Sequence, residues 1–181
     1  MLATQEYRDR VKQGRKIEKE IIETMRQNGM KISNPSSNDD IFKKVDAWFN
    51  RDGERIGIQI KFRETGSDLL FEVYDKFFGF NDPNNKIGRD LQGDAKLYAV
   101  KLNNQIVMVD KAKAVDAINE MIDEARCNGW SESNSCTKTL YYESDNQELQ
   151  LKLQHDPSDG RKKMIAYIPK EFFNNIVTIG G

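Results

Sequence analysis

Three side chains on two short segments have the types and the spacing to bind a metal ion and a phosphate. Asp46 lies in a strand-like segment at residues 44–49, and Gln59 and Lys61 lie in a second one at 57–62. Because successive side chains of a strand point to opposite faces, Gln59 and Lys61 share one face. An amide oxygen and an ammonium group on one face of an otherwise apolar strand contribute little to hydrophobic packing. They suit the binding of a cation and a phosphate.

The two segments are expected to pair as a hairpin. The gap at 50–54 contains an Asp-Gly pair, which is a strong signal for a tight turn. Pairing would place Asp46 on the strand next to Gln59 and Lys61. Ile58, Ile60 and Phe62 would fill the other face, toward the core.

The composition excludes several kinds of catalytic site. His155 is the only histidine, and it ends an alternating stretch beside a turn, so we expect a surface residue. Zinc sites rich in histidine cannot be built from it. Cys127 and Cys136 are too few and wrongly spaced for a zinc knuckle or a disulfide scaffold. Any chemistry must therefore use carboxylates, amides and lysines.

Length and charge indicate one soluble, cytoplasmic domain. The chain has 181 residues, of which 38 % are hydrophobic and 31 % charged, with a net charge of -1. No apolar run is long enough to cross a bilayer, and the N-terminus is charged, so no membrane association is expected. Basic residues cluster at 8–16, 61–63 and 161–163. Each cluster is either part of a local basic groove for a nucleic acid or an ordinary solvated face.

Residues 5–28 have the pattern of a helix with one apolar stripe. Apolar residues recur at spacings of three and four, and Asn28 and Gly29 form a typical C-terminal stop. Glu18 lies within this stripe, where a carboxylate is costly unless something pairs with it. Glu20 is the weaker alternative for a functional acid on this helix.

The rest of the chain alternates strands and one further helix. We expect strands at 68–74, 96–102, 105–110, 139–143, 148–154 and 163–168, and a helix capped by Asp110 that ends near Arg126. The sum is an α/β fold in a single domain, with a central mixed β-sheet flanked by helices.

The order of these residues resembles the PD-(D/E)XK nuclease superfamily, which has the restriction-endonuclease-like fold. Its pattern places an acid on the first helix, an Asp on one core strand and Glu-x-Lys or Gln-x-Lys on the next. Glu18, Asp46, Gln59 and Lys61 match these positions. The resemblance covers about residues 11–102 of a single domain at 1–181, and about 139–181 form a β-rich elaboration outside it. No Pro precedes Asp46, and Gln59 replaces the more usual Glu.

The resemblance implies a Mg²⁺-dependent nuclease acting on DNA, with Mn²⁺ as an alternative ion. Asp46, Gln59 and Glu18 would be metal ligands or would support them, and Lys61 would stabilise charge on the phosphate in the transition state. The small size suggests an endonuclease of phage or mobile-element origin, and analogy with the family suggests a homodimer. Two alternatives stay open: a non-catalytic nucleic-acid or protein-binding module on the same fold, and a Holliday-junction resolvase.

Overall fold

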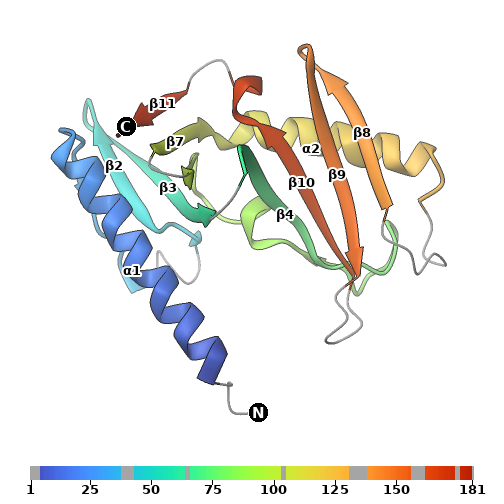
Figure 1. The fold of residues 1–181 in the computed structure, drawn as a ribbon, viewed down its shortest axis with the longest axis horizontal. Helices are drawn as coiled ribbons and strands as arrows, with labels where there is room; N and C mark the ends of the chain where they lie inside the picture. The colour runs from blue at the N-terminus through green and yellow to red at the C-terminus, as the bar shows by residue number, and fades with distance from the viewer. Residues whose placement is uncertain are drawn as a thin grey trace. The chain divides into compact units, whose positions relative to one another are not determined.

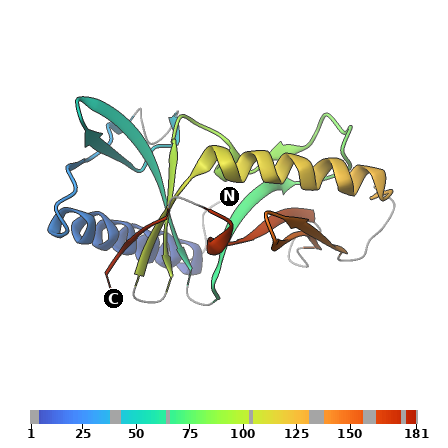
Figure 2. The same ribbon diagram turned by 90° about the horizontal axis from the view of Figure 1, so that it is seen from above.

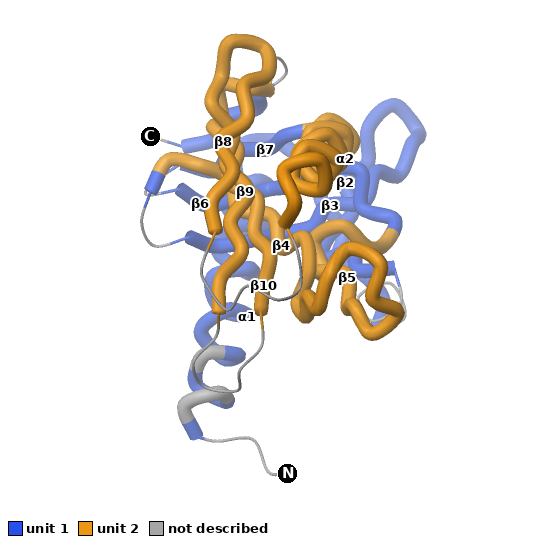
Figure 3. Tube along the Cα trace, turned by 90° about the vertical axis from the view of Figure 1, so that its right-hand side faces the viewer, with its two compact units in different colours: residues 1–66, 94–109, 176–181 blue, residues 67–93, 110–175 orange. Residues whose placement is uncertain are grey.

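The computed structural model describes residues 5–37, 43–63, 66–102, 105–130, 138–155, 162–173 and 176–180. The chain divides into two compact units, which Figure 3 shows in different colours. Unit 1 comprises residues 1–66, 94–109 and 176–181, and unit 2 comprises residues 67–93 and 110–175.

Unit 1 combines one long helix with a mixed sheet (Figure 1). Its elements are α1 (Gln5–Gln27), β1 (Ile32–Ser33), β2 (Ala47–Arg51), β3 (Glu54–Arg63), β6 (Leu97–Leu102), β7 (Gln105–Asp110) and β11 (Val177–Ile179). The strand order is β1-β2-β3-β6-β7-β11. β3 and β6 run parallel, whereas β2 pairs antiparallel with both β1 and β3.

The apolar stripe of α1 forms the core of unit 1. Ile21, Ile22 and Met25 are buried and pack in one cluster with Ile58 and Ile60 of β3. The helix ends as predicted at a glycine: Gly29 has φ +83°, and its N–H donates to the Arg26 carbonyl at 2.9 Å. The Met30 N–H donates to the Met25 carbonyl at 3.1 Å, which completes a Schellman motif.

The predicted hairpin is confirmed. β2 and β3 pair antiparallel, with Arg51 opposite Glu54. Asp52 and Gly53 between them have φ +51° and +84°, as a type I′ turn requires.

Unit 2 is an antiparallel sheet covered on one face by a helix. Its elements are β4 (Asp68–Lys76), β5 (Lys86–Ile87), η2 (Arg89–Leu91), α2 (Lys111–Cys127), β8 (Lys138–Ser144), β9 (Gln147–His155), β10 (Lys162–Pro169) and η3 (Lys170–Phe172). The strand order is β5-β4-β10-β9-β8. In Figure 2, seen from above, α2 runs along this sheet, where it contacts β8 and β9. As predicted, Asp110 caps α2: its Oδ1 accepts a hydrogen bond from the Ala112 N–H at 2.8 Å.

The structure confirms a mixed α/β chain with a mixed sheet and corrects two details. The strands are divided between two sheets rather than gathered in one, because β4 pairs with β10 while β6 pairs with β3. The first strand of the hairpin begins at Ala47 rather than Lys44. Lys44 has φ +54°, a left-handed conformation that interrupts an extended chain.

Candidate active site

Asp46 directly precedes β2, and its side chain accepts a hydrogen bond from the backbone of β3. Its N–H donates to the Ile58 carbonyl at 2.9 Å, although the residue opposite Ile58 in the ladder is Ala47. One step further, the Ile60 N–H donates to Asp46 Oδ2 at 2.7 Å, where a main-chain carbonyl would otherwise accept. The carboxylate is thus held at the backbone of Ile60, which lies between Gln59 and Lys61 in the sequence.

Gln59 and Lys61 differ in their exposure. Gln59 is only 1 % exposed. It lies opposite Tyr98 of β6, which is equally buried. Lys61 is half-buried. On the other face Ile58 and Ile60 are buried as predicted, but Phe62 is 40 % exposed.

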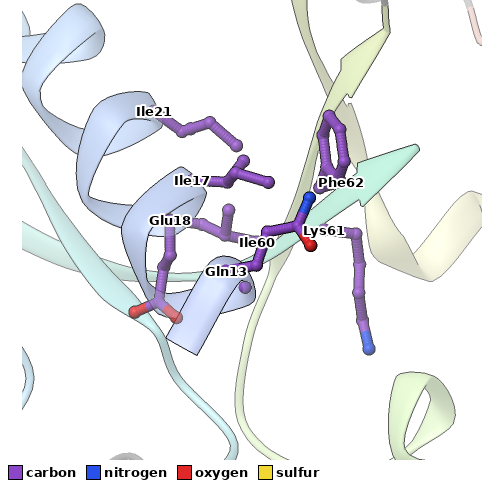
Figure 4. Close-up of a pocket in the computed structure, with 8 residues that line it drawn as sticks. Gln13, Ile17, Glu18, Ile21, Ile60, Lys61 and Phe62 are labelled. Atoms are coloured by element: carbon purple, nitrogen blue, oxygen red, sulfur yellow. The ribbon is translucent and has the colours of Figure 1, made fainter. Parts of the chain in front are cut away.

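A pocket of about 450 Å³ lies between α1 and β3 (Figure 4). Its lining residues are Gln13, Gly14, Ile17, Glu18, Ile21, Ile60, Lys61 and Phe62. The pocket therefore brings together Glu18 from the helix and Lys61 from the strand. Figure 4 shows the Glu18 carboxylate and the Lys61 ammonium group extending in the same general direction from these two elements.

Asp46 and Gln59 are not among the described residues that line this pocket. Asp46 is connected to it through its hydrogen bond with Ile60, which does line it. Gln59 is the neighbour of Ile60 in sequence, and its amide is buried. Glu18 and Lys61 thus line the cavity, whereas Asp46 and Gln59 do not line it and are related to it only through Ile60.

The two candidate acids of α1 have different surroundings. Glu18 is half-buried and lines the pocket. Glu20 is exposed, and its Oε2 lies 3.7 Å from Lys101 Nζ on β6, so it forms a surface ion pair. Of the two, only Glu18 has a place in the cavity.

The available ligand atoms are oxygens, which suit a hard cation such as Mg²⁺. Among the residues that the structure describes, no three His, Cys, Asp or Glu side chains gather to hold a metal ion. Mg²⁺ commonly keeps several waters and uses only one or two carboxylates. Asp46 and Glu18, with the amide oxygen of Gln59, match that requirement in chemical type.

Gln13 and Gly14 also line the pocket, although neither was predicted as a site residue. Gly14 lies in the middle of α1, where glycine is unfavourable relative to alanine. A Cβ built at this position would meet nothing within 4 Å. A glycine inside an amphipathic helical pattern was the signal available in the sequence.

Unit 2 has a second pocket of about 360 Å³ with a different character. Tyr141, Tyr142, Glu143, Asn146 and Glu148 line it at the β8–β9 hairpin. Partial burial raises the pKa of Tyr142, and its hydrogen bond to Glu120 and the negative charges of Glu120 and Glu124 raise it further. The described lining residues include two carboxylates and no cation, so this pocket does not suit a phosphate.

No family model, curated protein or solved structure matches this chain. The resemblance to the PD-(D/E)XK superfamily therefore stays a prediction from the sequence. In the part of the chain that the structure describes, no helix has the length and apolar content needed to cross a membrane.

Proposed function

We propose that this protein is a Mg²⁺-dependent nuclease that hydrolyses phosphodiester bonds in DNA, with a restriction-endonuclease-like core in unit 1. The observation that carries the proposal is the 2.7 Å hydrogen bond from the Ile60 N–H to Asp46 Oδ2. It fixes a carboxylate beside the strand that bears Gln59 and Lys61. We further propose an endonuclease that acts as a homodimer in the cytoplasm.

The proposal gives each site residue a role. The Ile60 N–H orients Asp46, and an oriented carboxylate is a better metal ligand than a mobile one. A bound Mg²⁺ would supply Lewis-acid stabilisation of the phosphoryl oxygens and promote deprotonation of a coordinated water. Glu18 supports the cation from α1, directly or through water. Gln59 holds the attacking water through its buried amide.

Lys61 stabilises the negative charge that develops on the phosphate in the transition state. Its side chain is half-buried and lines the cavity, where a cation acts more strongly than in bulk water.

The test is a cleavage panel with the purified full chain. Labelled linear, nicked, single-stranded and four-way branched DNA, together with single-stranded RNA, are incubated with Mg²⁺ or Mn²⁺ and with EDTA. We expect DNA cleavage that requires the metal. A marked preference for the four-way branched substrate would instead identify a junction resolvase.

The sharpest variant is Asp46→Asn, because the amide oxygen of Asn can still accept the Ile60 N–H while the charge is lost. We expect cleavage to fall at least about 100-fold with little change in thermal stability. Asp52→Asn is the matched control: Asp52 is exposed in the hairpin turn, and Asn tolerates its φ of +51°. Absence of any cleavage, or equal cleavage by the Asp46→Asn variant, would refute the proposal.

The burial of Gln59 favours a second candidate function. With 1 % exposure, this amide has little access to a substrate. A nucleic-acid-binding module on the same fold would need no metal and no exposed amide at this point. Metal-independent DNA binding without cleavage in the same panel would support that alternative.

A further inference from the structure

A described stretch in the first half of α1, residues 11–16, is helical although its side chains are not buried. Residues 11–16 are all exposed, and the fully buried side chains of this helix begin at Ile21. In Figures 1 and 3 these first turns extend beyond the strands of unit 1. Helices that lack packing are marginal in water. Burial of side chains in unit 1 therefore does not explain why residues 11–16 are helical.

A stripe of four basic residues runs along this exposed half. Arg8, Lys12, Arg15 and Lys19 recur at spacings of four, three and four, which places them on one side of the helix. All four are exposed, and none forms an ion pair with a residue that the structure describes. At a rise of about 1.5 Å per residue the stripe is about 16 Å long.

We infer that this stripe binds the phosphate backbone of double-stranded DNA. The inference extends the proposed function by naming a duplex as the partner and α1 as its docking element. Residues 8–19 contain six basic and two acidic residues, a net charge of +4 in a chain whose total is -1. The attraction for a polyanion is therefore local to this segment.

The stripe and the pocket share turns of α1 but lie on different sides of the helix. Gln13, Gly14 and Ile17 line the pocket, and at about 100° per residue they face away from the side that carries Arg8, Lys12, Arg15 and Lys19. A duplex carries one phosphate per about 3.4 Å along each strand, so a stripe of about 16 Å spans about five phosphates. A backbone that follows the stripe would therefore run along the side of α1 that faces away from the core of unit 1.

Two other polyanions fit less well. Helices that lie on a membrane surface need an apolar face to insert, but the apolar face of α1 is buried in unit 1 through Ile21, Ile22 and Met25. Single-stranded DNA is usually held by aromatic side chains on which the bases stack, and residues 8–19 contain no aromatic residue.

The test measures binding in EDTA, so that cleavage plays no part. Fluorescence anisotropy of a labelled duplex is recorded from about 50 to 200 mM salt. In the variant in which Arg8, Lys12, Arg15 and Lys19 are all Gln, the slope of log affinity against log salt should become shallower by about 3 to 4, because each lost phosphate contact contributes about 0.9. Circular dichroism verifies that the helix remains.

A matched pair of double variants keeps the test valid if the fourfold variant does not fold. Lys12→Gln with Lys19→Gln should reduce the slope by about 2. Lys31→Gln with Lys96→Gln removes the same charge from exposed positions of unit 1 outside the stripe and should leave it unchanged. Lys12→Arg with Lys19→Arg should bind like the natural protein.

The outcomes separate this inference from the proposed function. Stripe-dependent binding by a protein that never cleaves DNA would support the inference and refute the nuclease. A salt slope that is equal in both Gln double variants would refute the inference even if cleavage is observed. It would also be refuted if the stripe were needed for binding to phosphatidylserine vesicles but not to the duplex.

Discussion

Each of the two units fixes a carboxylate against the backbone of a strand, but the surroundings differ. In unit 1, Asp46 accepts the Ile60 N–H at 2.7 Å. In unit 2, Asp90 accepts the Glu72 N–H at 2.9 Å and is only 4 % exposed. The hydrogen bond alone is thus a structural device that both units use. What distinguishes Asp46 is its position next to a strand that carries Gln59 and a pocket-lining lysine.

The lysines of the two units show the same contrast. Lys111 of unit 2 is 4 % exposed, and its Nζ donates to the Gln92 carbonyl at 2.8 Å, so it connects α2 to the segment after η2. Lys61 of unit 1 is half-buried and lines a cavity together with Glu18. In unit 2 the buried Lys111 connects two segments through its hydrogen bond. In unit 1 the charged side chains of Glu18 and Lys61 line a pocket.

The largest effect is expected from Gly88→Ala in unit 2. A Cβ at Gly88 would lie 1.7 Å from the Glu72 carbonyl oxygen, and the Gly88 N–H donates to Val73 at 2.8 Å. The clash is with backbone, so the segment must move away from β4. We expect urea denaturation to show a loss of at least about 4 kcal/mol in the free energy of unfolding.

Gly129→Ala is the matched control for that variant. Gly129 has φ +65°, but a Cβ there meets nothing within 4 Å. Only the backbone conformation is strained, so the loss should be about 1 kcal/mol. Equal losses in the two variants would show that the close approach at Gly88 does not matter.

A smaller effect, on catalysis rather than folding, is expected from Lys61→Met. The substitution keeps the apolar stem and removes the charge that stabilises the transition state. We expect kcat/KM for DNA cleavage to fall about 10²- to 10³-fold with little change in the free energy of unfolding.

Lys111→Met should show the reverse behaviour. It leaves the Gln92 carbonyl without its donor, which should cost about 1 to 3 kcal/mol of stability. Cleavage per folded molecule should not change. If Lys61→Met also acted only on stability, the contrast between the units would disappear and Lys61 would be a structural residue.

Local patterns in the sequence were sufficient to predict most elements. The apolar spacing of α1, the Asp-Gly turn of the hairpin and the Asp110 cap of α2 each depend on residues within a few positions of one another. Helical periodicity and turn chemistry are local properties, so one sequence reveals them.

The pairing of strands could not be predicted in the same way. β11 joins β7 across about 70 residues of chain, and β4 leaves the sheet that contains β3. The alternation at Lys44–Asp46 also resembles a strand, whereas in the structure Lys44 has a positive φ and Asp46 bonds through its side chain. Likewise, the alternation of polar and apolar residues along β3 does not predict that the polar side chain of Gln59 is buried.

The smallest effect concerns Gly14, which can be compared with a helical position of unit 2. Glycine inside a helix costs about 0.5 to 1 kcal/mol relative to alanine, and no neighbour within 4 Å forbids a Cβ. Gly14→Ala should therefore raise the free energy of unfolding by about that amount. Because Gly14 lines the pocket, the added methyl group occupies space beside the site, and we expect cleavage to fall several-fold.

Asn119→Ala separates helix stabilisation from pocket filling. Asn119 is exposed on α2, where alanine should stabilise the helix by a similar amount, about 0.5 kcal/mol, without reaching the pocket. Thermal unfolding and cleavage rates are measured for both variants and for Gly14→Leu. If the space at Gly14 serves a substrate, activity falls from Gly to Ala to Leu and is unchanged in Asn119→Ala. Equal activity in all of these proteins would mean that glycine at this position serves no substrate, and that the cavity is not part of the site.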